Sequence, residues 1–433
     1  RAPAMGYLKA PRALLSLMDA GLTSVTGAQT IIGLLSSRRS VTRLILGHNE
    51  LGDDGCVVLF TFLSSALGRK YQITEISVNA NGIGNRGLLA VSEYLSGAGA
   101  LRELFLQNNC FTHDPATFSA FAAAVNASNL ELLSLTTNHG LSDSFLEVFL
   151  ASLDAPRLGE IHLSAIGLTA RAAPHLVAYL GSARCKLHTL KCNGNSLGYR
   201  GVRSIVRAIE RHNFSIQSLE LYSNNADGPV NDGDASEDEE EDDMVPAGLD
   251  AWKACESQIR RILLRNGHLK RETENDALRL LQYSRPLLLV SSHTRNNTSR
   301  VNDCSCDSED QSPSSRQVET DGTGTSPIPS LPIELQQHIL SFFAPSLSAA
   351  QRIRIYNYAS SPSTLPRLGL CLPQLVATGG DFCIPDSAGT AAFGGGSIGG
   401  KYAGAQGSRE QQRTAWLRLV ECTAYDPRRA VVL

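Results

Sequence analysis

Asparagine recurs at nearly regular spacing along the first half of the chain, and its amide can both donate and accept hydrogen bonds. The marker series is Asn49, Asn81, Asn109, Asn138, Ile166, Asn195 and Asn224, in steps of 32, 28, 29, 28, 29 and 29 residues. Such a ladder of amides could bind a ligand, or it could pair backbone groups that would otherwise be buried without partners. We predict the structural role for the six asparagines, because the strand-to-loop corner of each repeat needs such a partner.

Other residues that could do chemistry lack the partners which that chemistry requires. His162 and His188 have no nucleophile or carboxylate at a recurring offset. Cys304 and Cys306 have no histidine or further cysteine nearby at zinc-binding spacing. The stretch GGSIGGKY matches a phosphate-binding loop in its glycines and lysine, but Tyr402 stands where a Ser or Thr must bind Mg²⁺. We therefore predict no catalytic residue, no metal site, no cofactor and no enzymatic activity.

The repeated sequence L-x-x-L-x-L-x-x-N-x-L must position the asparagines. Its first part places apolar residues on one face of a short strand, and the residues that follow repeat at helical spacing, as Val202, Ile205 and Ile209 do. One 29-residue step before Asn49 lies Ala20, within a degenerate first unit, so the sequence predicts eight units. A strand-plus-helix unit cannot bury its apolar face alone, so neighbouring units stack into a parallel sheet with helices on its outer side.

The repeats resemble the leucine-rich repeats of the ribonuclease-inhibitor-like family, whose units follow the pattern NxLGxxGxxxLxxxL. The fullest matches are 49–63 and 195–209, and the similarity covers about half of the chain. It implies an α/β solenoid with a parallel concave sheet and convex helices, in the form of a horseshoe. The departures are Ile166 in place of asparagine, a one-residue shift at Leu141, and a proline-containing, poorly helical stretch at 111–118.

The concave sheet of such a solenoid is the natural surface for a partner. Its side chains are those four and two residues before each marker position: Ile45/Gly47, Ser77/Asn79, Phe105/Gln107, Ser134/Thr136, His162/Ser164, Lys191/Asn193 and Glu220/Tyr222. Aromatic and charged side chains dominate many protein interfaces. We expect a protein partner to bind seven of these residues: Phe105, Gln107, His162, Lys191, Asn193, Glu220 and Tyr222. The alternative, that the aromatic side chains are simply exposed, stays open at this point.

An acidic run follows Asn224, where the last unit should supply its helix. Nine carboxylates lie between Asp232 and Asp243, and the calcium-loop order D-x-D-x-D-G is absent. Carboxylates so close together repel one another and cannot pack on an apolar surface. We interpret 227–245 as a disordered insertion in the last repeat. It either adds solubility, docks a basic partner or screens basic residues of the same chain: Arg260, Arg261, Lys270 and Arg271.

Two helices are predicted after the insertion. The first, 246–266, carries the apolar stripe Leu249, Trp252, Ile259, Ile262 and Leu263. The second begins near Thr273 and carries a further apolar stripe. Together they form a cap, 246–290, over the exposed last repeat, and they complete a domain that spans 1–290.

The second half of the chain begins with a polar stretch, 291–328, which is predicted to be a disordered linker. A helical region, 329–375, follows. Its sequence LPIELQQHILSFF, at 331–343, resembles the opening of an F-box, which implies docking on a ubiquitin-ligase adaptor, but the later Val-Cys-x-x-Trp segment is missing. The alternative is an amphipathic helix pair, capped at Ser348 with Gln351 three residues later, that packs on the solenoid end or on a partner.

The last part of the chain has two sections. A Gly-rich linker is predicted at 376–407. An amphipathic helix is predicted at 408–433, capped by Ser408 and carrying an apolar stripe that packs on the body of the protein: Trp416, Leu419 and Val420.

Composition narrows the class of protein. A net charge of −3 argues against general nucleic-acid binding. The sequence contains no run of about 18 apolar residues, the length that would predict a membrane span. Ten cysteines are too sparse for a disulfide scaffold, so a reduced compartment is expected, either the cytoplasm or the nucleus. Cys56, Cys110 and Cys192 are predicted to be small buried core residues. A monomer is expected.

A third function competes with the scaffold and the F-box receptor. Repeats of this family followed by an acidic stretch resemble Ran GTPase-activating protein, and Arg43, Arg69 and Arg102 are residues that could stabilise charge during hydrolysis. Eight units are fewer than is usual in that family, however, and apolar helices follow the acidic stretch. A non-enzymatic protein-interaction scaffold is therefore the leading prediction.

Overall fold

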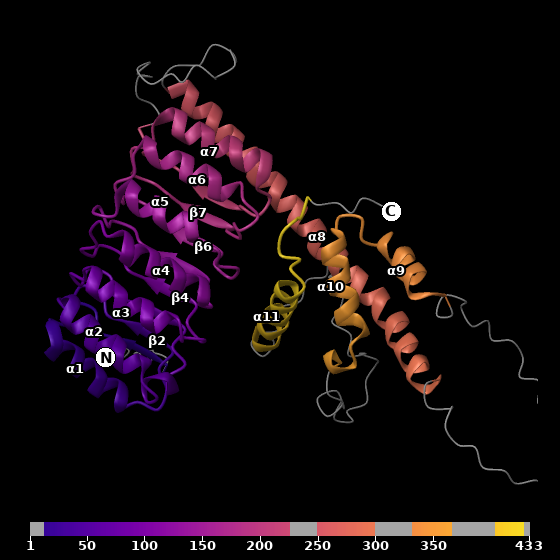
Figure 1. Ribbon diagram of the computed structural model, residues 1–433, viewed down its shortest axis with the longest axis horizontal. Coiled ribbons are helices and arrows are strands. Elements are labelled where there is room, and N and C mark those ends of the chain that lie inside the picture. Colours follow the sequence, from indigo (N-terminus) through magenta and orange to yellow (C-terminus); the bar gives the residue numbers. More distant parts are fainter. Residues whose placement is uncertain (1–12, 226–248, 299–330, 366–402, 428–433) are drawn as a thin grey trace, which may run out of the picture. The chain divides into compact units, whose positions relative to one another are not determined.

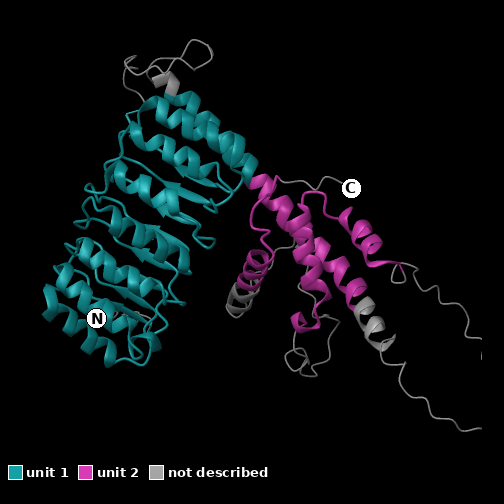
Figure 2. Ribbon diagram, in the orientation of Figure 1, with its two compact units in different colours: residues 1–266 teal, residues 267–433 magenta. Residues whose placement is uncertain are grey.

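The computed structural model describes residues 13–225, 249–298, 331–365 and 403–427. Two compact units divide the chain, residues 1–266 and 267–433 (Figure 2). This division differs from the predicted domain limit at 290. The predicted insertion 227–245 and most of the predicted linkers 291–328 and 376–407 lie outside the described residues.

Eight short parallel strands form one sheet in chain order, which confirms the predicted solenoid and its degenerate first unit. Neighbouring strands pair at the same repeat position, so that Leu44 lies beside Ile76 and Ile76 beside Leu104. The strands are β1 Leu14–Ser16, β2 Arg43–Ile45, β3 Glu75–Ser77, β4 Glu103–Phe105, β5 Leu132–Ser134, β6 Glu160–His162, β7 Thr189–Lys191 and β8 Ser218–Glu220.

Helices alternate with the strands and lie together on one face of the sheet (Figure 1). They are α1 Ser24–Ser36, α2 Gly52–Ser64, α3 Asn85–Leu95, α4 Pro115–Ala127, α5 Ser142–Ser152, α6 Ala173–Leu180 and α7 Gly198–His212, with 3-10 turns at Gly68–Lys70 and Ala170–Ala172. Helix α4 begins normally despite its proline, because Pro115 takes the first helical position and the Asp114 side chain accepts a hydrogen bond from the Ala116 N–H. The opposite face of the sheet, termed the concave face, carries no helix of the repeats.

The core of the first unit lies between the sheet and the helices. The middle residue of each strand is buried, and so is the inner stripe of each helix. Four phenylalanines fill the middle of this layer: Phe118, Phe121, Phe145 and Phe149, whose neighbouring ring centroids are 4.9, 5.0 and 5.9 Å apart. Burying a side chain of this size stabilises the fold by about 2 kcal/mol, so the repeats are held together mainly through this layer.

A single helix of 50 residues, α8 Leu249–Thr298, replaces the two helices that were predicted after the acidic run. The prediction ended the first helix at Asn266, just before Gly267, and began a second near Thr273. Glycine inside a helix costs only about 1 kcal/mol. The Asn266 amide donates to the carbonyls of Asn213 and Ile216, and the Thr273 hydroxyl donates to Leu269 within the helix. Their polar groups are therefore satisfied without a break.

The first turns of α8 pack on the last repeat. Ile259 and Ile262 are buried there, with Trp252 and Leu263 partly buried beside them. The Arg265 guanidinium donates to three backbone carbonyls at the end of α7, those of Ile209, Glu210 and Asn213. It also lies 4.6 Å from the centroid of the Phe214 ring. Arg265 thus satisfies orphan carbonyls of the last repeat helix.

The second unit is helical and has its own core. Besides the later part of α8, it contains α9 Ile333–Ser341, α10 Ala349–Ser360, a 3-10 turn at Pro362–Thr364 and α11 Ala403–Leu419. The predicted capping box is present, with Ser348 and Gln351 each bonded to the other's backbone. The core residues are Ala277, Leu280, Leu288, Leu340, Ala344, Leu347, Ile355, Tyr356, Ala359, Leu417, Val420 and Cys422.

Two predictions for the last helix are wrong. Ser408 lies inside α11 rather than at its cap, because the helix already begins at Ala403. Leu419 is 65% exposed, whereas Leu417 is buried. The apolar stripe therefore runs through Trp416, Leu417 and Val420, with Leu417 in the place predicted for Leu419.

One of the three cysteines predicted to be buried is exposed. Cys56 and Cys192 lie in the core, but Cys110 is exposed. It directly follows the marker asparagine, and the residue at this position is exposed in every unit from the second to the eighth. Within the described ranges, none of the helices is both long and apolar enough to cross a membrane.

Candidate functional site

The asparagine side chains tie each repeat to the one before it. The Asn49 Nδ2 donates to the carbonyls of Leu17 and Leu46 at 2.8 and 2.9 Å, and its Oδ1 accepts from the N–H groups of Ala20 and Leu22 at 3.0 and 3.1 Å. Asn109 and Asn195 repeat this four-bond pattern further along the chain, with small changes. These amides are engaged by backbone groups inside the corner, which leaves them poorly placed to bind a ligand.

The ladder is incomplete at three positions. Asn81 and Asn224 still donate to backbone carbonyls, but their Oδ1 atoms are buried with no hydrogen-bond partner among the described residues. Ile166 is fully buried and supplies no amide at all. The junction between β5 and β6 therefore lacks the asparagine bridge; across it, the Asp143 carboxylate accepts a 2.7 Å bond from the Thr169 N–H.

The residue before each marker position adopts a left-handed backbone conformation in all eight units. Their φ angles lie between 51° and 65°, and only one of the eight is glycine: Asp19, His48, Ala80, Asn108, Thr137, Ala165, Gly194 and Ser223. This conformation turns the chain out of the sheet and brings the marker side chain into the corner. A left-handed residue other than glycine costs about 1 kcal/mol, and the cost is greater for a β-branched residue such as Thr137.

The concave face carries three rows of side chains, of which sequence reasoning identified two. The third row lies six residues before each marker and contains Arg43, Glu75, Glu103, Leu132, Glu160, Thr189 and Ser218. Side chains two residues apart in a strand share a face. Extending the predicted pairs by two residues toward the N-terminus would have found this row, which holds most of the acidic groups on the face.

Ion pairs join charged residues on the first half of the concave face and directly before its strands. Arg43 and Glu75 form a two-pronged pair, and Arg102 lies 3.6 Å from Glu131. Glu103, between these pairs, has no ion-pair partner among the described residues. Burial, followed by the charge of Glu75, raises the pKa of Glu103 above its ordinary value.

A connected polar network occupies the second half of the concave face. The Glu160 carboxylate is 2.6 Å from the His162 ring and 3.9 Å from the Lys191 ammonium group. Lys191 is also 3.8 Å from Glu220, whose carboxylate accepts a 2.7 Å bond from Asn193. The structure thus brings together four of the seven predicted site residues.

Of the other three predicted residues, Phe105 and Gln107 lie apart from this network, whereas the Tyr222 backbone N–H donates to the Asn193 Oδ1 at 2.9 Å. Phe105 is half-buried on β4, and the Gln107 amide beside it donates to the Ser134 hydroxyl at 2.8 Å. Tyr222 is 52% exposed after β8, with its ring centroid 6.0 Å from that of Trp252. Four strand positions separate Phe105 from Tyr222, so the two aromatic side chains do not form one cluster.

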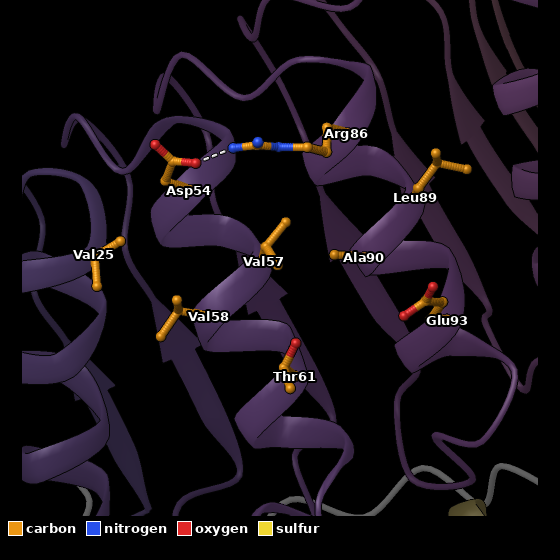
Figure 3. Close-up of a pocket in the computed structure, with 9 residues that line it drawn as sticks. All are labelled: Val25, Asp54, Val57, Val58, Thr61, Arg86, Leu89, Ala90 and Glu93. Carbon is orange, nitrogen blue, oxygen red and sulfur yellow. Dashed lines mark hydrogen bonds and ion pairs between the residues drawn. The ribbon is translucent and has the colours of Figure 1, made fainter.

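A shallow groove lies on the helical side, across α1, α2 and α3 (Figure 3). Its volume is about 430 Å³, and sequence reasoning did not predict it. Its lining is aliphatic in the middle, with an Asp54–Arg86 ion pair at one edge. The residues that line it are Val25, Asp54, Val57, Val58, Thr61, Arg86, Leu89, Ala90 and Glu93. Unlike the concave face, it draws on only three repeats.

Buried thiols in the first unit are protonated at neutral pH. Burial raises the pKa of Cys192 to about 12 and that of Cys185 to about 11. Neither thiol is thus a nucleophile under ordinary conditions. In the part of the chain that the structure describes, no group of three or more His, Cys, Asp or Glu residues could hold a metal ion.

Comparison with known proteins supports the repeat fold. No protein-family model matches the chain. It is 27% identical over 223 residues to the human "NACHT, LRR and PYD domains-containing protein 13". The matched region covers 45% of this chain and 21% of that protein. It is 24% identical over 230 residues to the Dictyostelium discoideum "Rho GTPase-activating protein gacW", and this match covers 51% of this chain and 20% of that protein. The bovine "NACHT, LRR and PYD domains-containing protein 3" is 27% identical over 219 residues, with coverage of 44% and 21%.

The chain therefore spans about a fifth of the length of these curated relatives. The matched part is about half of this chain, which is also the share that the repeats occupy. Together with the eight parallel strands and their alternating helices, this similarity identifies the chain as one that contains a leucine-rich-repeat domain.

Proposed function

We propose that this leucine-rich-repeat protein is a non-enzymatic interaction scaffold that binds a protein partner on its concave face. One observation carries the proposal. All eight strands present side chains on a face that no helix of the repeats covers, so residues from separate repeats form one continuous surface. Leucine-rich-repeat domains typically bind proteins, and extended faces of this kind are how solenoids do so.

The side chains on this face have the character of an interface. Phe105 supplies aromatic contact area near the middle of the sheet, and Tyr222 supplies it at the end of the sheet formed by β8. The polar network around Lys191 lies between them. Aromatic residues with a few charged neighbours contribute most of the binding energy in many interfaces. The His162 ring is bonded to the Glu160 carboxylate, an arrangement that favours a binding role over a catalytic one for this histidine.

Affinity purification with two triple variants tests the proposal. The first variant is Phe105→Ala, Lys191→Ala and Tyr222→Ala on the concave face. The matched control is Arg86→Ala, Leu89→Ala and Glu93→Ala on the helical side. We expect the first variant to lose a protein that the wild type and the control both retain. Recovery of the same proteins by all three would contradict the assignment to the concave face.

A second candidate function, that of an F-box-like receptor for a ubiquitin ligase, is favoured by the exposed apolar residues in and just after α9. Leu335, Phe342 and Phe343 are 49%, 71% and 41% exposed. Since α9 and α10 share a core with α8 and α11, the test uses the full chain and not an isolated segment. Binding of the purified adaptor that is lost in Leu335→Asp would support this function, and no binding by the wild type would remove it.

A third candidate, a GTPase regulator, is favoured by the name of the Dictyostelium relative, a Rho GTPase-activating protein. Each of the three arginines considered for it already binds a group of the domain itself: Arg43 binds Glu75, Arg69 donates to two carbonyls and Arg102 lies beside Glu131. Single-turnover GTP hydrolysis by purified Ran and Rho, with and without the full chain, tests it. Unchanged rates would exclude it for these two GTPases.

A further inference from the structure

Glu103 is the one carboxylate in the first half of the concave face that lacks an ion-pair partner among the described residues. Its neighbour across the sheet, Glu75, is bound to Arg43, and Glu131 is beside Arg102. Arg43 and Arg102 are thus paired with other acids, although the charge of Arg43 still acts on Glu103 from a distance. Glu103 is also half-buried, which weakens its hydration and makes a positively charged partner more valuable to it.

An aromatic ring lies beside this carboxylate. Phe105 is two residues further along β4 and therefore faces the same side, about 6.6 Å away along the strand. The residues paired with Phe105 on the neighbouring strands are small, Ser77 and Ser134, so bulky side chains do not cover the ring from either side. On the side of β5, the residue paired with Glu103 is Leu132, which adds apolar surface.

The rest of the concave face differs from this position. From Glu160 to Glu220 the charged groups are bonded to one another, so a partner's charge would have to break existing contacts there. At Glu103 it would break none. The strongest attraction for a positive charge is therefore at β4.

We propose that the partner seats an arginine side chain at this position, with its guanidinium on the Glu103 carboxylate and over the Phe105 ring. This inference rests on the proposed binding function of the concave face and specifies its partner. A guanidinium is planar, binds a carboxylate through two parallel N–H groups and stacks on an aromatic ring, whereas an ammonium group does only part of this. A partner segment with an arginine beside apolar residues matches both the charge and the shape of the position.

A random 12-residue peptide library, selected on the full chain, tests this inference. A free peptide of residues 227–245 is added as a competitor, so that peptides which merely bind the acidic segment are removed. Selected peptides are then measured against wild type, Glu103→Gln, Phe105→Ala and the control Glu93→Gln. Glu93 is exposed on the helical side and has no ion-pair partner among the described residues. Denaturant unfolding of each variant shows that it remains folded.

We expect the selected peptides to contain arginine and to bind at least tenfold more weakly to Glu103→Gln and to Phe105→Ala, with no change for Glu93→Gln. Replacing the arginine of a peptide by citrulline, which has the same shape and no charge, should weaken its binding to a similar extent. Peptides that need Phe105 but neither Glu103 nor an arginine would overturn the inference and leave the proposed function intact. Peptides whose binding is unchanged by substitution of Phe105, Glu103, Lys191 or Tyr222 would overturn both this inference and the proposed function of the concave face.

Discussion

The binding role proposed for Glu103 comes at the expense of stability. Its raised pKa means that the folded protein holds the proton of this carboxyl group more tightly than the unfolded chain does. Stability is therefore higher while Glu103 is protonated, and it falls as pH rises from near the ordinary value of 4.5 through the raised pKa. A carboxylate kept under this penalty is typical of a functional surface.

At pH 7, Glu103→Gln should raise the free energy of unfolding by about 0.5 kcal/mol, the scale of charge effects at partly exposed sites. Below pH 4, where both side chains are neutral, the difference should vanish. Denaturant unfolding at both pH values measures it. A variant that is less stable than the wild type at pH 7 would show that the Glu103 carboxylate does not destabilise the fold.

Thr137 is held in a left-handed backbone conformation. It is a β-branched residue with a φ of 60°, and its N–H donates to the Ser164 carbonyl in the same corner. Thr137→Asn should stabilise the protein by about 1 kcal/mol, because asparagine tolerates the left-handed conformation better. The matched control, Thr136→Asn, changes the same residue type one position earlier, where the backbone is not left-handed. Equal effects in chemical denaturation would show that backbone strain is not the cause.

At the scale of elements, one helix is capped by its neighbour in the preceding repeat. Helix α3 has no capping side chain of its own, and the Asp53 carboxylate in α2 accepts from the N–H groups of Gly84 and Gly87, both at 2.7 Å. A negative charge at a helix N-terminus also interacts favourably with the helix dipole. Helix α2 thereby helps to fix the start of α3.

Asp53→Ala should therefore lower the free energy of unfolding by about 1.5 kcal/mol. The matched control is Asp54→Ala, which removes a neighbouring carboxylate that pairs with the exposed Arg86, and which should change stability by less than about 0.5 kcal/mol. Urea unfolding compares the two. A loss that is as large for Asp54 as for Asp53 would contradict the capping role.

The element scale also shows what the sequence could predict and why. The strands and helices of the repeats could be predicted from the spacing of apolar residues, because a unit that is ambiguous alone can be assigned from the register of the other seven. The continuous α8 did not, since the choice at Asn266 and Gly267 depends on carbonyls of the last repeat that accept from Asn266. Glu103 was missed for a different reason: its role depends on which neighbouring charges are already paired, and that needs the sheet register.

At the scale of the whole molecule, two cores lie in one chain. The first unit depends on contacts such as those of Arg265 with the end of α7, and the second on residues such as Leu340, which is 1% exposed. Separate cores with their own buried residues are expected to unfold in separate transitions.

Calorimetry of the full chain and of two variants tests this expectation. Arg265→Ala should destabilise the first unit by about 2 kcal/mol, because it leaves carbonyls unsatisfied. Leu340→Ala should destabilise the second by about 3 kcal/mol through the cavity that it leaves. We expect each variant to lower the midpoint of one transition only. If both variants shift one common transition, the chain unfolds as a single cooperative body.

Ile166 has a mechanical consequence. In a linear array of repeats each junction carries the tension applied to the two ends, so the array parts at its weakest link. The junction between β5 and β6 has no asparagine bridge, and the helix that follows it, α6, is the shortest of the seven repeat helices, at 8 residues. A chain pulled between residues 14 and 225 should therefore rupture first at that junction, into a block of five repeats and a block of three.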